Sequence, residues 1–491
     1  MTARTAGDQA IGATKERAPW PIVVMLICVI MVPIEFSFRV AGLFLTTSKL
    51  CMIVMTFVIL PKLPSLKMKP YDWLIVAHAF WTATALILLY GTASGLQSSG
   101  FYLLEFLVVY LVARIYLRTP GQLKATINVL FVMVAISAAF AIPEGLTGKP
   151  IVHEIARAMT GNYYPLNHET RMGIFRAKSF FEHEILYGVF CASTLAMVWF
   201  ASTPEQRVWK APLIGVATFF SASSAPLMIF TLQIWLLLLE RFTRTVKNRL
   251  LVVSSSIGVV LLMLDTFTGR GVLGIITMVS LNPATAWNRR AIWQFGIDDV
   301  MRNPFFGFEP ITYSRPNWLG ASVDNYWLLI MMRSGIPALV FLFLALLLIW
   351  LATCRLGNKN ELVVRLRNGW GMAIVALLLT GATVAFFGKL QPLFSFFIGF
   401  GAALANSYRP EEETPTEKAA EPVRRGPVFS RFGPEAIGAM RQRPEQPVVS
   451  ARAEASNARG ESLPLRRQPA AAEPGREPGP ERNKPTLSRS G

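Results

Sequence analysis

Residues 326–352 read YWLLIMMRSGIPALVFLFLALLLIWLA, an apolar run in which Arg333 is the one charged residue. A transmembrane helix needs about 20 predominantly apolar residues, and this run is longer than that. The stretch therefore predicts a membrane-spanning helix. An arginine inside such a helix is costly in lipid, so Arg333 is expected to face a cavity or a partner charge.

The composition of the whole chain agrees with this prediction. Of 491 residues, 53% are hydrophobic and 16% are charged, and the mean hydropathy is +0.42. Soluble globular domains carry about 25% charged residues. These values exclude a soluble enzyme, a disordered chain and a disulfide scaffold. The four cysteines (Cys28, Cys51, Cys191 and Cys354) lack metal-ligand spacing, so neither a metal site nor a disulfide framework is indicated.

Apolar runs separated by breakers predict an all-α polytopic membrane protein with about twelve transmembrane helices. The predicted spans are 20–37, 42–60, 72–92, 101–117, 123–143, 185–202, 210–222, 225–240, 249–265, 326–352, 370–387 and 390–407. The segment 210–240 allows one long helix or two short ones. A break at residues 223–226 (SSAP) is favoured, because it keeps the basic residues of 241–249 on the cytoplasmic side.

The net charge of +18 comes largely from Lys and Arg at the ends of apolar runs. In the twelve-span topology these basic ends fall on one side, whereas the opposite short loop 91–100 (GTASGLQSSG) has no charge. Cytoplasmic loops are enriched in Lys and Arg, so both termini are expected to be cytoplasmic. The positive charge is therefore assigned to membrane anchoring, and no nucleic-acid partner is expected.

Three regions follow from this topology. Residues 1–19 are a cytoplasmic N-terminal tail, residues 20–407 the transmembrane bundle, and residues 408–491 a Pro-, Glu-, Arg- and Ala-rich cytoplasmic tail that is expected to be disordered. Two long segments, about 144–184 and 266–325, are expected outside the membrane on the extracytoplasmic side. Loops of this length are usually functional or disordered, and their aromatic residues favour function.

The second outer loop predicts a helix that begins at Asn282-Pro283 and ends near Asn303, before Pro304. Helical spacing places Arg290 on one face with Trp293, Gln294 and Ile297. An arginine suits bidentate phosphate binding. The alternative is anchoring of Arg and Trp at the membrane interface, which these residues alone favour.

Two polar residues precede the span at 326, namely Asp324 and Asn325. Asp324 suits a helix N-cap, which is the commoner use of Asp there. Alternatively, it could accept a proton from a sugar hydroxyl.

The first outer loop contains Arg171, Arg176 and Lys178 close to the acidic residues Glu182 and Glu184. The basic residues either bind an anion or neutralise these acids. The run Glu182-His183-Glu184 does not predict a metal site, because adjacent helical residues diverge and no second ligand set completes it.

Several stretches in this order resemble the O-antigen ligase/polymerase superfamily, and most closely its exopolysaccharide polymerases. They are RAKSFFEHEILYG (Arg176–Gly188), TAWNRRAIW (Thr285–Trp293), NPFFGF (Asn303–Phe308), DNYWLL (Asp324–Leu329) and RSGIP (Arg333–Pro337). With the hydropathy layout, the resemblance covers roughly residues 20–407.

The resemblance implies a metal-independent glycosyltransferase at the outer face of the bacterial cytoplasmic (inner) membrane, without a cofactor. It would join repeat units linked to polyprenyl pyrophosphate, within a lipid bilayer and with a chain-length regulator or export complex as a further partner. The implied pyrophosphate ligands are Arg289, Arg290 and Arg176, with Arg290 also catalytic. The implied acceptor-activating residue is Asp324, and the implied glycan contacts are Trp293, Trp318 and Asn325.

The chain also departs from the family. Ligases carry a histidine where Asp324 stands, which favours a polymerase. A family proline is replaced by Glu184, a family glycine by Glu309, and the turn at Ser223-Ser224 lacks the arginine often found there. Two alternatives remain, a ligase that transfers the glycan to a lipid or protein and a flippase or exporter of lipid-linked glycans.

Overall fold

The computed structural model of the chain describes residues 16–40, 42–165, 169–243, 283–356 and 360–407, with isolated positions between 244 and 282. All of these residues belong to one compact unit, Met1–Thr414. The predicted span 249–265, the start of the second outer loop, most of the N-terminal tail and the tail 408–491 lie outside the described residues.

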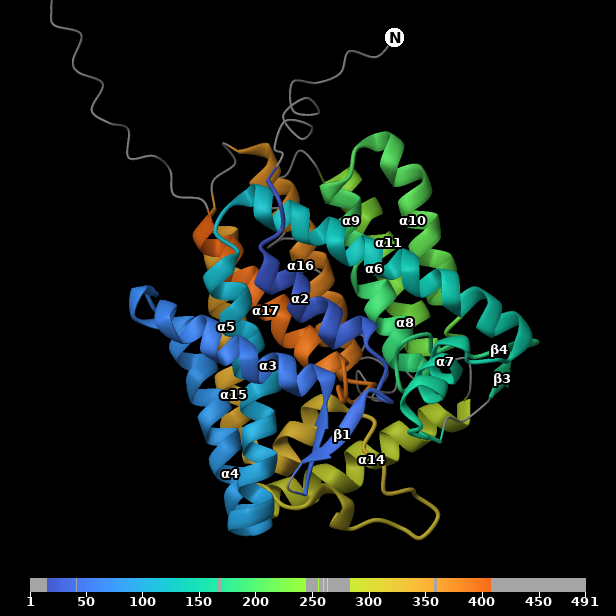
Figure 1. The fold of residues 1–491 in the computed structure, drawn as a ribbon. Coiled ribbons are helices and arrows are strands. Elements are labelled where there is room, and N and C mark those ends of the chain that lie inside the picture. Colours follow the sequence, from blue (N-terminus) through green and yellow to red (C-terminus); the bar gives the residue numbers. More distant parts are fainter. Residues whose placement is uncertain are drawn as a thin grey trace, which may run out of the picture. The chain divides into compact units, whose positions relative to one another are not determined.

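The described chain is almost entirely helical, with two short antiparallel hairpins (Figure 1). The elements in order are α2 (Trp20–Leu26), η1 (Ile27–Met31), β1 (Ser37–Val40), β2 (Leu43–Thr46), α3 (Thr47–Ile59), η2 (Leu60–Ser65), α4 (Pro70–Tyr102), η3 (Leu103–Val108), α5 (Val109–Tyr116), α6 (Pro120–Thr147), α7 (Ile151–Thr160), β3 (Thr170–Arg171), β4 (Ile174–Phe175), α8 (Glu184–Ser193), α9 (Leu195–Ala201), α10 (Pro204–Phe219), α11 (Ser224–Phe242), α14 (Pro283–Arg302), η4 (Pro310–Thr312), α15 (Tyr326–Cys354), α16 (Glu361–Gly381) and α17 (Leu390–Ser407). In the hairpins Ser37 pairs with Thr46 and Thr170 with Phe175.

Seven of the described helical stretches are long and apolar enough to cross a membrane, as a multi-pass membrane protein requires. They are Thr47–Ser65, Pro70–Tyr116, Pro120–Thr147, Glu184–Ala201, Ser224–Phe242, Tyr326–Cys354 and Glu361–Gly381. The predicted count of twelve spans is not established by them. The predicted break within 210–240 is confirmed, because α10 ends at Phe219 and α11 begins at Ser224.

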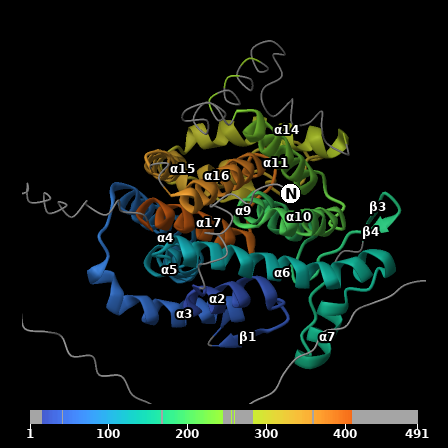
Figure 2. The ribbon, with the colours of Figure 1, turned by 90° about the horizontal axis from the view of Figure 1, so that it is seen from above.

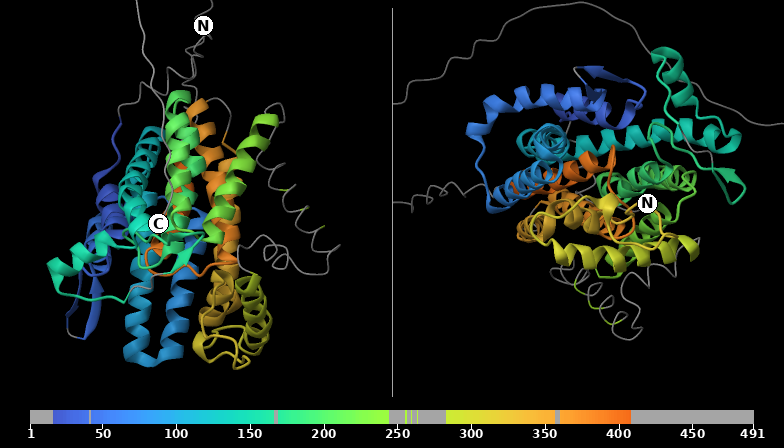
Figure 3. Two further views of the ribbon diagram at one scale, coloured as in Figure 1. Left: turned by 90° about the vertical axis from the view of Figure 1, so that its right-hand side faces the viewer. Right: turned by 90° about the horizontal axis from the view of Figure 1, so that it is seen from below.

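The segment 91–100, predicted as a short loop, is helical, and that prediction was wrong. The chain turns at Gly91 (φ 76°), and the following helix runs back against the preceding one. The two light-blue helices at the bottom of the left view in Figure 3 show this hairpin. Ser99 Oγ donates to Ala83 O at 2.7 Å. A Cβ on Gly95 would lie 2.6 Å from Ile87 Cα. The small polar residues of this segment therefore permit a close helix crossing, as small residues do in membranes.

Helix α15 is interrupted where the second outer loop docks against it. Gly335 has a non-helical backbone (φ 75°), so nearby peptide groups lose their helical partners. The NPFFGF turn at 303–308 replaces these partners. Ile336 N donates to Pro304 O at 2.7 Å, and Phe308 N donates to Met332 O at 2.5 Å. Buried backbone groups must be paired, and this exchange pairs them.

The same junction leaves no space for a side chain. A Cβ on Gly335 would lie 1.9 Å from Phe305 O, and one on Gly307 would lie 2.1 Å from Met332 O. Trp81 of α4 closes the junction, since its ring stacks on Phe306 with centroids 5.1 Å apart. The two motifs NPFFGF and RSGIP are therefore parts of one docking joint.

Helix α14 lies alongside α15, as Figure 2 shows. The two helices share a small apolar cluster with the loop that joins them, formed by Ala291, Ile292, Val300, Tyr313, Leu319, Val323, Leu328, Met331 and Met332. Buried Asp299 of α14 accepts from Ser314 N at 2.5 Å. These contacts fix the second outer loop against the bundle.

Candidate functional site

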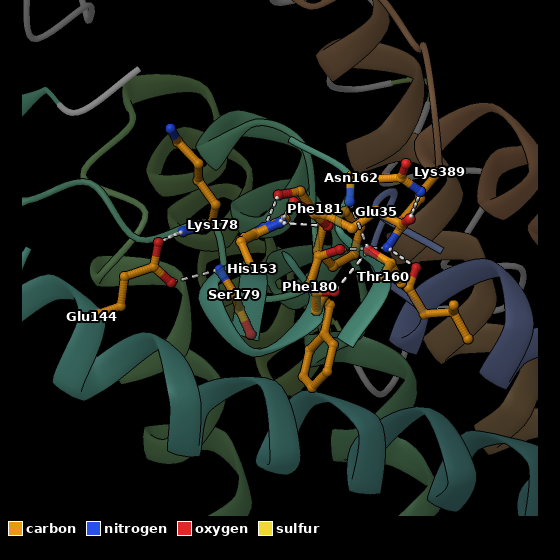
Figure 4. Close-up of polar contacts among 12 residues, drawn as sticks. Glu35, Glu144, His153, Thr160, Asn162, Lys178, Ser179, Phe180, Phe181 and Lys389 are labelled. Atoms are coloured by element: carbon orange, nitrogen blue, oxygen red, sulfur yellow. Dashed lines mark hydrogen bonds and ion pairs between the residues drawn. The ribbon is translucent and has the colours of Figure 1, made fainter. Parts of the chain in front are cut away.

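The first outer loop sends one segment, residues 176–183, into the interior, where side chains from several elements hold its backbone (Figure 4). Glu144, at the end of α6, accepts from Lys178 N at 3.0 Å and from Ser179 N at 2.8 Å. Lys389 Nζ donates to Phe180 O, and His153 Nε2 lies 3.0 Å from Phe181 O. The segment is therefore a fixed part of the site.

This anchoring gives a first prediction. Glu144→Ala removes the acceptor of two buried amide N–H groups, each of which costs about 1–3 kcal/mol when unpaired. We expect the apparent melting temperature of the purified protein, followed by tryptophan fluorescence, to fall by at least about 2 °C. Glu154→Ala, which changes an exposed carboxylate on α7, is the control and should leave the melting temperature unchanged. Equal melting temperatures for both variants would contradict the anchoring role.

Arg176 is buried beside two carboxylates, which bears on its predicted role as a pyrophosphate ligand. Its guanidinium pairs with Glu184 at 2.5 Å and with Glu169, and its Nη2 donates to Ser223 Oγ at 2.9 Å. Burial lowers the pKa of Arg176, and Glu184 partly offsets this effect. The structure therefore gives Arg176 a role in joining the first outer loop to the α10–α11 turn. Its charge is balanced by Glu184 and Glu169, although its buried Nε has no hydrogen-bond partner among the described residues.

The two consecutive arginines of α14 lie in different environments. Arg289 is only 9% exposed, whereas Arg290 is exposed, with its guanidinium 5.9 Å from the centre of the Trp287 ring. Gln294, on the predicted face of Arg290, is also exposed. The arginine that faces the protein is therefore Arg289. The predicted face of Arg290 is divided, because Arg290 and Gln294 are exposed whereas Trp293 and Ile297 pack against the cluster between α14 and α15.

Arg289 brings the two outer loops into electrostatic contact. Its pKa is lowered by burial and by the nearby Arg171 of the first loop, and it is partly restored by the carboxylate of Asp324. The Nε of Arg289 has no hydrogen-bond partner among the described residues. A buried donor without a partner calls for an explanation, and an anionic ligand supplies one.

His183 faces the same region from the first loop. Burial lowers its pKa, Glu184 and Asp324 raise it, and Arg176 and Lys178 lower it. Asp324 is thus an electrostatic neighbour of both His183 and Arg289. We call this group the outer-loop cluster, with the members Arg171, Arg176, Lys178, His183, Glu184, Arg289 and Asp324.

The cap of α15 is Asn325, so the interpretation of Asp324 as a helix N-cap was wrong. Asn325 accepts from Leu328 N at 3.0 Å and donates to Ala382 O at 3.0 Å, and it is buried. These bonds leave Asn325 little capacity for a glycan. Half-buried Asp324 accepts from Ser322 Oγ at 2.9 Å. Its carboxylate is therefore free of the capping role.

The two predicted sugar-stacking residues differ in accessibility. Trp293 is half-buried and packs against the apolar cluster between α14 and α15. Trp318 is 66% exposed. A sugar ring needs an open aromatic face, so Trp318 is the better placed of the two.

Sequence reasoning did not identify Lys389, a buried lysine between α16 and α17. It lines a cavity of about 250 Å³ together with Lys49, Glu105 and Glu182. The sequence did contain one signal for it, because Lys389 is a charged residue in the two-residue connection between the predicted spans 370–387 and 390–407. Glu105 and Glu182 were visible in the sequence, but nothing there placed them together.

Among the described residues, no three His, Cys, Asp or Glu side chains are grouped to hold a metal ion. No family model matches the chain, and no curated protein matches it. Function must therefore be inferred from the residues and their geometry.

Proposed function

We propose that this protein is a polysaccharide polymerase that joins repeat units carried on polyprenyl pyrophosphate. The observation that carries this proposal is Arg289, a buried guanidinium that lacks a partner for Nε among the described residues and interacts electrostatically with Asp324. A cation and a carboxylate in one partly buried site fit a reaction in which an anion leaves and a hydroxyl loses a proton. In this proposal the anion is a pyrophosphate, as the resemblance of both outer loops to the O-antigen ligase/polymerase superfamily implies.

The proposed reaction exchanges one bond for another at the anomeric carbon of the donor sugar. The acceptor hydroxyl oxygen forms a bond to that carbon, the bond to the pyrophosphate oxygen breaks, and its electron pair leaves with the pyrophosphate. Asp324 takes the proton of the hydroxyl. Arg289, with Arg171 nearby, stabilises the negative charge that develops on the leaving group. Inversion and retention are both compatible with these roles.

The proposal includes a twelve-span topology in the bacterial inner membrane, with both termini in the cytoplasm. Contacts among described residues support the predicted alternation of inner and outer helix ends. The predicted inner ends meet one another, because Arg365 Nη2 donates to Ser202 O at 2.8 Å and Glu16 accepts from Thr119 Oγ1. The predicted outer ends meet at the outer-loop cluster. A chain-length regulator or export complex is the proposed partner beyond the lipid-linked glycan and the bilayer.

Accumulated intermediates distinguish a polymerase from its alternatives. In a strain that lacks this protein, we expect lipid-linked single repeat units to accumulate at the outer face of the membrane, with no polymer. The measurement is mass spectrometry of extracted lipid-linked glycans, combined with their accessibility to an impermeant glycosidase. Accumulated long lipid-linked chains would indicate a ligase, and single repeats confined to the cytoplasmic face would indicate a flippase.

A further inference from the structure

A second site is the cavity beside Lys389. One of its lining residues, Glu182, directly precedes His183 of the outer-loop cluster in the sequence, but no member of that cluster lines the cavity. Its charged residues are Lys49, Glu105, Glu182 and Lys389, and residues 46–48 (TTS) add hydroxyl-bearing side chains. The remaining lining is mainly apolar and includes Val29, Pro33, Phe44, Met52 and Pro392. In the predicted topology Glu182 and Lys389 lie at outer ends, whereas Val29 and Met52 lie deeper in their spans, so the cavity extends inward from the outer side. The cavity is therefore on the side where the proposed reaction takes place.

Both lysines in this cavity already make contacts within the protein. Lys389 Nζ donates to three backbone carbonyls, Val32 O at 2.7 Å, Ile30 O at 3.3 Å and Phe180 O. An ammonium has three donors, so none of them remains for a ligand. Lys49 Nζ lies 3.9 Å from the centre of the Phe101 ring, a cation–π contact. Lys389 therefore balances charge and has no hydrogen bond left to offer, whereas Lys49 is held over an aromatic ring.

The carboxylates, by contrast, have acceptor capacity. Glu182 Oε2 is buried and has no hydrogen-bond partner among the described residues. Gly388, with φ +52°, keeps the space beside it open, since a Cβ there would lie 3.1 Å from that oxygen. Glu105 comes from η3, a π-helical turn, and such turns are frequent at functional sites. Two acceptors therefore face the cavity from different elements.

This balance selects a class of ligand. An anion would meet two carboxylates, and the described residues provide no third ligand for a metal ion. A neutral molecule that presents several O–H donors satisfies the carboxylates and leaves Lys389 on its backbone carbonyls and Lys49 over the Phe101 ring. Apolar and aromatic walls with a few polar groups are typical of small-molecule sites. Drug-sized ligands occupy pockets of about 300–1,000 Å³, so this cavity suits about one sugar ring.

We propose that this cavity is a saccharide subsite in which Glu182 and Glu105 accept hydrogen bonds from the hydroxyl groups of one sugar of the lipid-linked glycan. The identity of the ligand rests on the proposed polymerase function. Glu182 is separated from Glu184, which pairs with Arg176, by His183 alone. One rigid segment therefore carries both the sugar-binding carboxylate and part of the outer-loop cluster.

The test measures binding of two lipids by native mass spectrometry of the purified full-length protein. One probe is undecaprenyl pyrophosphate, which has no sugar, and the other is the lipid-linked saccharide fraction extracted from the source organism. Wild type should bind the saccharide-bearing lipid at least tenfold more tightly than the sugar-free lipid. Glu182→Gln and Glu105→Gln should each remove most of this difference and leave the affinity for undecaprenyl pyrophosphate unchanged. Glu154→Gln is the matched control, because Glu154 is exposed outside the cavity.

The possible outcomes separate this inference from the proposed function. Equal wild-type affinity for both lipids, or full retention of the difference in both cavity variants, would overturn the saccharide subsite and leave the pyrophosphate proposal intact. Failure of wild type to bind either lipid would overturn both. If one variant does not fold, the other still decides, since Glu182 and Glu105 belong to different segments.

Discussion

Replacement of Arg289 by alanine is expected to reduce sugar transfer by at least about 100-fold, the usual effect of removing a group that stabilises transition-state charge. Arg289 is the buried arginine of the pair, and its Nε has no partner among the described residues. The loss should appear in single-turnover transfer by the purified protein. Arg290→Ala, one residue away and exposed, is the matched control. Exposed charges contribute about 0–1 kcal/mol, so its activity should change by less than about fivefold.

A third variant separates charge from geometry. Arg289→Lys keeps the charge but loses the planar fork that binds phosphate through two hydrogen bonds. Its activity should lie between those of wild type and Arg289→Ala. All three variants should have similar melting temperatures and elution profiles. A larger loss in Arg290→Ala than in Arg289→Ala, with both proteins folded, would contradict the assignment of the pyrophosphate ligand to Arg289.

Gly335→Ala is expected to prevent the second outer loop from docking and so to cause the largest loss of folded protein. Gly335 has φ 75° and ψ 174°, a region that is essentially restricted to glycine, so an alanine there costs about 1–3 kcal/mol by itself. In addition, its Cβ would meet Phe305 O at 1.9 Å, and that oxygen is backbone that cannot move without breaking the joint. The yield of monodisperse protein in fluorescence-detected size exclusion should fall sharply.

The control for this prediction is Gly100→Ala. Gly100 lies in the second helix of the α4 hairpin, where an added Cβ meets nothing within 4 Å. Alanine is a better helix former than glycine, so the yield of this variant should equal or exceed that of wild type. Equal yields for Gly335→Ala and wild type would mean that the turn at 303–308 does not depend on the break in α15.

Local sequence signals predicted part of the structure. Pro283 at its start and Pro304 after its end predicted the range of α14, and the SSAP run at 223–226 predicted the break between α10 and α11. These signals operate within one or two turns of a helix, so a sequence without any partner information contains them. The long apolar runs likewise predicted helices that could span a membrane.

Other features depend on contacts between distant segments, and the sequence pattern did not contain them. Helical periodicity grouped Arg290 with Trp293, but it could not say which side of α14 faces the bundle. The turn at Gly91 was hidden because small polar residues suit both a loop and a tight helix crossing. Asp and Asn are about equally favoured as helix caps, so residue type could not decide between Asp324 and Asn325, and it is Asn325 that takes the position. The cavity is formed by residues from Val29 to Pro392, so no local pattern could predict it.

The most direct test of polymerase activity uses the purified protein in lipid nanodiscs, supplied with a polyprenyl-pyrophosphate-linked repeat unit, with the products separated by size. Wild type should produce a ladder of lengths that differ by one repeat, and Arg289→Ala should produce none. A single shifted product that forms only when an acceptor lipid is added would indicate a ligase. No transfer with the cognate donor would contradict the enzyme proposal and favour a transporter of lipid-linked glycans.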